Sequence, residues 1–166
     1  MVELFQGGTL IAATITMGLS AGLFYTFSIS VMLGLRRTDD RTFVDVMQRI
    51  NVAILNGWFA IGFGGALVFT VATAILNAIG DARPALPWIV AALVLYGSTL
   101  AITLTVNVPL NNELDAAGEP DRIVDIAATR DRFEARWVRW NVARAVTSAA
   151  ALGLLTWALV LHGRAT

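Results

Sequence analysis

Four long apolar segments constrain this chain more than any other feature of its sequence. A transmembrane helix needs about 20 consecutive, mostly apolar residues, and four segments satisfy that requirement, at about 8–35, 53–79, 86–106 and 142–161. Among them only the fourth contains a charged residue, Arg144, in its first turn. We therefore predict an all-α fold, an integral membrane four-helix bundle in which residues 1–166 form a single membrane domain.

The composition agrees with a lipid-embedded chain and argues against several kinds of site. Hydrophobic residues make up 57% of the chain and charged residues 14%, whereas a typical soluble domain has about 25% charged residues. There is no cysteine and one histidine, His162, so haem, zinc, copper and non-haem iron sites are poorly supported. We expect no metal and no cofactor. The net charge is zero and no basic patch carries interleaved aromatic residues, which argues against nucleic acid as a partner.

The placement of arginine predicts how the spans are oriented, because cytoplasmic loops carry an excess of basic residues. The loop between spans one and two and the loop between spans three and four hold nine arginines: Arg36, Arg37, Arg41, Arg49, Arg122, Arg130, Arg132, Arg136 and Arg139. The other loop and the C-terminal tail hold two, Arg83 and Arg164. We expect a multi-pass protein of the cell membrane with loops one and three cytoplasmic and both termini outside.

The segment before the fourth span has a helical pattern of its own. Pro120, a residue favoured at the first position of a helix, is followed by no helix breaker until Gly153. Apolar side chains recur at helical spacing, at Ile123, Ile126, Phe133, Trp137 and Trp140. This pattern predicts an amphipathic cytoplasmic helix at about 121–140 that leads into the fourth span. It leaves open whether the helix continues unbroken to residue 161 or bends at the membrane surface.

Polar side chains enter the membrane at the start of the fourth span. Four of them share one helical face, at positions i, i+3, i+4 and i+7: Trp137, Trp140, Asn141 and Arg144. Amide and guanidinium groups in a low dielectric cost several kcal/mol unless they are paired. Their presence in an apolar span therefore requires partners.

Amides from other spans meet them at the same end of the bundle. Asn107 and Asn111 lie four residues apart at the end of span three, with Pro109 between them. Gln48 and Asn51 lie three residues apart at the start of span two. Since consecutive spans alternate in direction, both pairs should lie beside Asn141.

Two interpretations of this cluster follow from the residues. In one, the amides and Arg144 satisfy each other and act as interhelical contacts. In the other, they line a polar pocket for an amphipathic ligand. The amides bond carbonyls and hydroxyls, and an arginine holds an oxyanion, so the set suits a phenol, enol or carboxylate. We assign Arg144, Asn141, Asn107 and Asn111 as catalytic candidates, and Trp137, Trp140, Gln48 and Asn51 as candidate substrate-binding residues.

Several segments resemble a known family in order and spacing. They are AGLFYTFSISVMLGLRR, VMQRINVAILN, NVPLNNEL and RFEARWVRWNVARA, and together they resemble the anthrone-oxygenase-like family of small integral membrane proteins. The resemblance spans nearly the whole chain, and NVPLNN followed by W-x-x-W-N-x-x-R is its most specific part. One departure is Leu33, where members often carry a proline after the first-span methionine.

The resemblance implies a four-helix membrane protein. In its fungal members it implies oxidation of an anthrone to an anthraquinone by molecular oxygen, without metal or flavin, in polyketide biosynthesis. We therefore expect a membrane-embedded, cofactor-independent monooxygenase acting on a lipophilic, anthrone-like or phenolic aromatic substrate, with oxygen and the lipid bilayer as its other partners. The alternative is a non-enzymatic membrane protein that binds a small lipophile or serves as a subunit of a partner complex. The sequence leaves open whether the chain forms a homo-oligomer.

Overall fold

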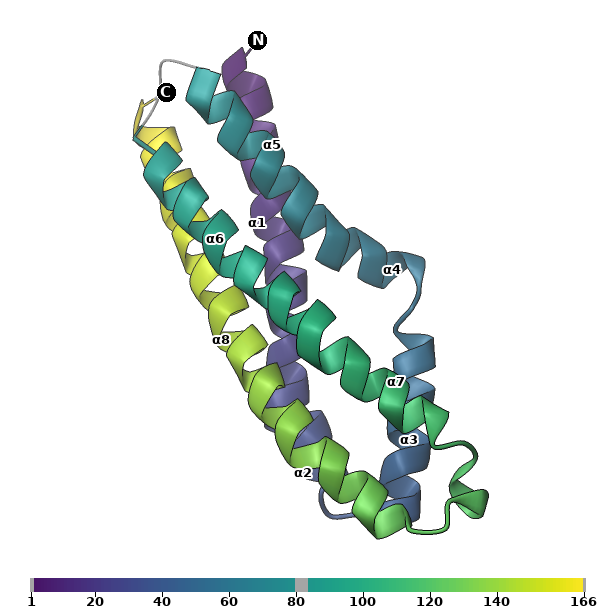
Figure 1. Ribbon diagram of the computed structural model, residues 1–166. Helices are drawn as coiled ribbons and strands as arrows, with labels where there is room; N and C mark the ends of the chain where they lie inside the picture. Colours follow the sequence, from purple (N-terminus) through teal and green to yellow (C-terminus); the bar gives the residue numbers. More distant parts are fainter. Residues whose placement is uncertain (1, 80–83, 166) are drawn as a thin grey trace.

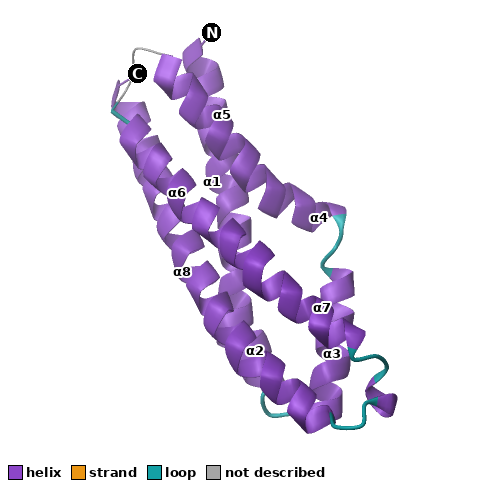
Figure 2. Ribbon diagram, in the orientation of Figure 1, coloured by secondary structure: helices purple, strands orange, loops and turns teal. Residues whose placement is uncertain are grey.

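All secondary structure in the described part of the chain is helical (Figure 2). The computed structural model describes residues 2–79 and 84–165. Its helices are α1 (Val2–Thr26), η1 (Phe27–Val31), α2 (Met32–Leu35), α3 (Asp40–Ala53), α4 (Gly57–Phe59), η2 (Ala60–Gly64), α5 (Gly65–Ile79), α6 (Leu86–Ile102), η3 (Thr103–Asn107), α7 (Val108–Ala116), η4 (Pro120–Arg122) and α8 (Ile126–Ala165). The prediction of an all-α fold is confirmed.

Four continuous helical stretches are long and apolar enough to cross a membrane: Glu3–Leu35, Gly57–Ile79, Leu86–Ala116 and Ile126–Arg164. They are referred to below as spans one to four. Both chain termini lie at the same end of the bundle (Figure 1). This end is called the terminal end, and the opposite end, where α3 and α7 lie, is called the α3 end. Arg83, in the connection between spans two and three, lies outside the described residues.

The terminal half of the bundle is closely packed. Its core is formed by Leu10, Met17, Ile89 and Leu155, whose side chains are fully buried, together with small residues from all four spans. At Gly65, an added Cβ would lie 3.1 Å from the Thr16 Cγ2 atom, which shows how closely α5 approaches α1. Small residues permit this approach, and such packing is the main source of helix association in lipid.

Span two begins four residues later than the sequence predicts, because residues 40–53 form a separate helix, α3. The Asp39 side chain caps α3 by accepting from the Thr42 backbone N–H at 2.9 Å. The Thr42 hydroxyl and this N–H hold the pKa of the Asp39 carboxyl below its usual value. Asn56 then caps α4, accepting from the backbone N–H groups of Trp58 and Phe59. Asparagine is a strong N-cap, so the helix restarts at Gly57.

The last helix also differs from its predicted start near residue 121. Pro120 opens only the short 3-10 turn η4. Asp125 caps α8 instead, with its carboxylate accepting from the Ala128 N–H at 2.9 Å. From Ile126 the helix runs for 40 residues without a break, so the leading segment and span four are one continuous element. Within the predicted apolar stripe, Phe133 and Trp137 are buried and Trp140 is half-exposed.

Candidate ligand-binding cavity

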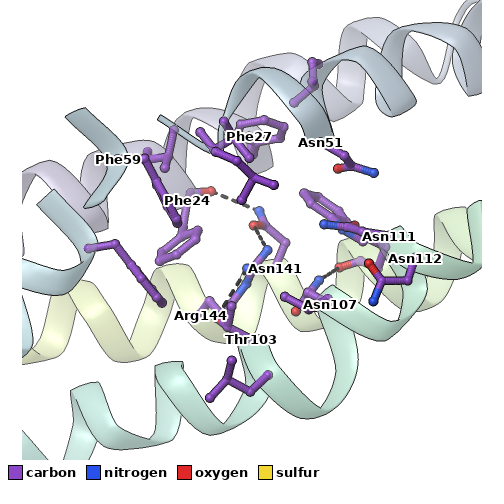
Figure 3. A pocket seen from close by; sticks show the side chains of 18 of the residues that line it. Phe24, Phe27, Asn51, Phe59, Thr103, Asn107, Asn111, Asn112, Asn141 and Arg144 are labelled. Carbon is purple, nitrogen blue, oxygen red and sulfur yellow. Dashed lines mark hydrogen bonds between the residues drawn. The ribbon is translucent and has the colours of Figure 1, made fainter. Parts of the chain in front are cut away.

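A cavity of about 340 Å³ lies in the α3 half of the bundle, within the size range of ligand pockets. All four spans and α3 contribute to its lining. The aromatic lining residues are Phe24, Phe27, Phe59, Phe63 and Trp137, and the polar ones are Asn51, Thr103, Asn107, Asn111, Asn112, Asp115, Asn141 and Arg144. Figure 3 shows polar side chains from η3, α7 and α8 gathered opposite Phe24 and Phe59.

Three of the four spans change to π-helical geometry where they border this cavity, in η1, η2 and η3. A π-helical turn makes i→i+5 hydrogen bonds, which widens the helix, and such turns occur often at functional sites. In span three the cause is local. Pro109 has no N–H and its ring crowds the carbonyl of Thr105, and η3 ends at Asn107, two residues before it.

The carbonyls at these turns accept hydrogen bonds from neighbouring spans. The Tyr96 hydroxyl donates to the Phe63 carbonyl in η2 at 2.7 Å. Asn141 Nδ2 donates to the Phe24 carbonyl, just before η1, at 3.0 Å. The regions of η1 and η2 are thereby tied to other spans.

Arg144 is the central charged group of the cavity. Its side chain reaches from α8 and is 5% exposed. One guanidinium nitrogen donates to Asn141 Oδ1 at 2.9 Å and the other to the Thr103 hydroxyl at 3.4 Å. The guanidinium carbon lies 4.4 Å from the Phe24 ring centroid and 5.4 Å from that of Trp137, distances suited to cation–π attraction. Among the described residues, no carboxylate forms an ion pair with Arg144.

Asn141 orients this arginine. Its amide nitrogen donates to the Phe24 carbonyl and to the Ser28 hydroxyl at 2.9 Å, while its oxygen accepts from Arg144. Both donor hydrogens are used on span one, so the oxygen must face Arg144. The amide therefore connects spans one and four and fixes the position of the guanidinium.

The span-three amides are positioned by Trp137. Asn107 Nδ2 donates to the Trp137 carbonyl at 3.3 Å, and the Trp137 indole N–H donates to Asn111 Oδ1 at 2.8 Å. Asn107 is buried and Asn111 is half-buried. Arg144 does not bond to either amide; its partner on span three is the hydroxyl of Thr103. This differs from the interpretation in which Arg144 and the amides of other spans satisfy each other.

Three buried polar atoms in this lining have no hydrogen-bond partner: Arg144 Nε, Asn107 Oδ1 and Asn51 Nδ2. Two are donors and one is an acceptor. A buried polar atom without a partner costs about 1–3 kcal/mol, so their presence together around one cavity is informative. A ligand that offers an acceptor to the arginine and a donor to Asn107 would satisfy two of them, and Asn51 would need a further acceptor.

Of the eight site residues predicted from the sequence, the structure brings six to the cavity: Arg144, Asn141, Asn107, Asn111, Trp137 and Asn51. Gln48 is elsewhere. Its amide donates to the carbonyls of Leu114 and Gly118, which ties α3 to the end of α7. Trp140 does not line the cavity either; its ring lies 5.9 Å from the Arg139 guanidinium carbon. Trp140 shares a helical face with Trp137 in the sequence pattern, yet only Trp137 borders the cavity.

The sequence-based reasoning missed the aromatic wall and Thr103. Phe24, Phe27, Phe59 and Phe63 are apolar residues in apolar spans, so no sequence pattern separates them from residues that face lipid. Thr103 had a usable signal, because it lies four residues before Asn107 and shares its helical face.

One carboxylate borders the cavity, that of Asp115 at the exposed edge of α7. Glu113, two residues earlier, borders a separate cavity of about 50 Å³ between α7 and α8. No group of three or more histidine, cysteine, aspartate or glutamate side chains is arranged to hold a metal within the described residues. The cavity therefore offers amide, hydroxyl, guanidinium and aromatic groups.

Comparison with protein families gives one match. The model of the anthrone oxygenase family matches residues 56–154, more than half of the chain. The chain belongs to the anthrone oxygenase family. No curated protein and no solved structure matches it. The matched region of this family member contains Thr103, Asn107, Asn111, Trp137, Asn141 and Arg144, whereas Asn51 and the aromatic residues of span one lie outside it.

Proposed function

We propose that this chain is a membrane-embedded, cofactor-independent oxygenase that acts on a lipophilic, anthrone-like or phenolic aromatic compound. Membership of the anthrone oxygenase family supports the reaction class. The aromatic walls suit a flat polycycle, which can pack on Phe24 and Trp137.

The observation that carries the proposal is the unpartnered, buried face of Arg144. Its Nε–H has no acceptor and no carboxylate neutralises its charge among the described residues. A cation held in a low dielectric without an anion stabilises negative charge that develops on a ligand. The enolate oxygen of a deprotonated anthrone is such a group, and Asn107 Oδ1 can accept from a hydroxyl beside it.

The chemistry needs no resident redox group, because the substrate itself supplies the electrons. Loss of a C–H proton gives an electron-rich enolate, and its carbon forms a bond to molecular oxygen. After protonation, the resulting hydroperoxide loses its second C–H proton while the O–O bond breaks. One oxygen atom becomes the new carbonyl and the other leaves as water. The protein stabilises the enolate and excludes bulk water from it.

Asp115 is our candidate for the first proton acceptor. It lies eight residues after Asn107 on the same side of η3 and α7, and both side chains border the cavity. Eight residues of helix span about 12 Å, and the C–H carbon lies across the central ring from the enolate oxygen, so the proton would reach the carboxylate by way of water at the polar edge of the cavity. Asp115 is exposed and can pass the proton on to water.

The proposal is tested by oxygen uptake with a model anthrone in the purified, reconstituted protein. We expect uptake with one quinone formed per oxygen consumed. Arg144→Lys should lower kcat/KM by about 100-fold or more, because a compact ammonium cannot replace a planar guanidinium or a positioned oxyanion donor. Arg139→Lys, on the exposed face of the same helix, serves as the matched control and should keep full activity.

The alternative, a protein that binds a lipophile without reaction, makes a different prediction in this experiment. A wild-type protein that binds an anthrone through Arg144 but consumes no oxygen above the spontaneous rate would establish that alternative. An Arg144→Lys protein that unfolds in mild detergent would instead favour a purely structural role for the arginine.

We also propose that the α3 end faces the cytoplasm, because nine arginines lie there: the four between spans one and two, Arg122, and the four near the start of span four. The chain lacks cysteine, so single cysteines report accessibility cleanly. Cysteines replacing Thr38 and Ala117 should resist a membrane-impermeant thiol reagent in intact cells, and one replacing Asp81 should react. The reverse labelling pattern would refute this orientation.

A further inference from the structure

The cavity is bordered by spans two and three, which diverge beside it. Spans two and three pack on each other through α5 and α6 in the terminal half. Toward the α3 end, η2 packs on α1 whereas η3 packs on α8, and Figure 1 shows α4 and α7 diverging with α3 crossing below them. Phe59 lines the cavity on one side of this divergence, and Leu104 and Val108 line it on the other.

The rim of this divergence is apolar and accessible. Leu104 is 65% exposed and Leu55 is 79% exposed, yet both line the cavity. A residue that is largely exposed and also borders a cavity marks the place where the cavity meets the surroundings. At this level of a membrane bundle, the surroundings of apolar side chains are lipid.

The depth of the opening is indicated by the residues next to it. Trp58, in the first turn of span two, is 83% exposed, and exposed tryptophans concentrate at the membrane–water interface. Asn112 and Asp115 mark the polar edge of the cavity one to two turns beyond Val108. The opening therefore lies on the hydrocarbon side of the membrane–water interface, in the leaflet at the α3 end.

We propose that the ligand reaches the cavity sideways from the hydrocarbon layer of that leaflet, through an opening between spans two and three bordered by Leu55, Phe59 and Leu104. The occupant is a lipophile with an apolar body and one polar end, which enters with the polar end toward Arg144. The proposed route rests on the proposed function in one respect only, which is that the ligand is lipophilic. A water-soluble ligand would have to pass the polar edge at Asp115.

The experiment follows the rate of binding and not the reaction. A background that keeps Trp137 as its single tryptophan reports binding of 1,8-dihydroxyanthraquinone, an already oxidised probe, delivered from phosphatidylcholine vesicles. Leu104→Cys modified with a bulky aromatic maleimide should bind the probe about tenfold more slowly than the same unmodified variant, since association rates fall when access is obstructed.

The matched control is Val94→Cys with the same maleimide. Val94 lies on the same span and is also 65% exposed, but it does not line the cavity. Its modification should change the association rate by less than about twofold. Modification of Asp115→Cys, at the polar edge of the cavity, tests the aqueous route, and the lipid route predicts that it slows binding less than modification of Leu104→Cys does.

Slower binding with modified Asp115→Cys and not with modified Leu104→Cys would overturn the proposal in favour of an aqueous route. Lost affinity with an unchanged association rate for modified Leu104→Cys would contradict it as well. The probe does not react with oxygen, so the two proposals can fail separately. A protein that binds the probe through this opening but consumes no oxygen with an anthrone would support the route and contradict the oxygenase function.

Discussion

The terminal half and the α3 half of this bundle are packed differently. In the terminal half, small residues such as Ala13, Ala66 and Gly65 let the spans approach closely, and large side chains such as Leu155 are fully buried. In the α3 half, π-helical turns widen three spans, α3 is detached from span two, and about 340 Å³ remains open. Among the described residues, both halves hold buried polar atoms without partners, Thr73 Oγ1 and Asn77 Oδ1 in the first and three in the second, but only those of the second belong to residues that line this cavity.

The two halves also differ in where their unpaired polar atoms lie. Polar side chains in the terminal half bond within their own helix, as Thr16 and Thr70 do, and also across spans, as Gln6 does to the Leu76 carbonyl. Around the cavity, side chains bond across spans, and three buried polar atoms are left without partners. Unsatisfied buried polar atoms lower stability in both halves, and under the proposed function those of the cavity-lining residues are the ones that a ligand would pair.

The strongest test of this comparison is Asn107→Leu. Removing the unpartnered Oδ1 should lower affinity for the anthraquinone probe about 30-fold, the equivalent of about 2 kcal/mol for a lost buried hydrogen bond. The stability of the empty protein should change by less than about 1 kcal/mol, because removal of the unsatisfied Oδ1 offsets the loss of the Nδ2 bond to the Trp137 carbonyl. Equilibrium binding and thermal unfolding of the reconstituted protein measure the two effects. A variant that fails to fold would assign Asn107 to structure and not to recognition.

A matched pair of leucine-to-alanine substitutions, one in each half, compares how closely the two halves are packed. Leu155→Ala in the packed half should lower the free energy of unfolding by about 2 kcal/mol, since it opens a void between four spans. Leu23→Ala should cost less than about 1 kcal/mol, because Leu23 already borders the cavity. Unfolding by a denaturing detergent in mixed micelles measures both. Equal losses would show that the two halves are packed alike.

The smallest expected effect is at the boundary between the halves. Tyr96 is fully buried, and its hydroxyl bonds the Phe63 carbonyl and Ser20. Tyr96→Phe should cost about 1 kcal/mol of stability and loosen η2. Thr105→Ala, which removes an exposed hydroxyl on the lipid-facing side, should change stability by less than about 0.5 kcal/mol. Thermal unfolding compares them, and a Tyr96→Phe protein as stable as wild type would show that η2 needs no support from span three.

Much of the site could be predicted because polar residues stand out in apolar spans. Asn107, Asn111, Asn141 and Arg144 are recognisable by type, and the alternation of span directions places them at one end. Helix starts were less predictable. Asp125 and Asn56 cap α8 and α4, but caps are single residues that resemble ordinary loop residues until the backbone geometry is known.

The sequence by itself determined the number of spans, the end of the bundle that holds the polar cluster, and the helical face that carries Asn141 and Arg144. These follow from hydropathy and from the helical repeat, which are local properties. Only the tertiary structure decided that Gln48 and Trp140 lie away from the cavity, that Phe24 and Phe59 form its wall, and that Arg144 has no anionic partner among the described residues. Those facts depend on how separate helices rotate and diverge, and the energy that sets these rotations comes from contacts between residues far apart in the chain.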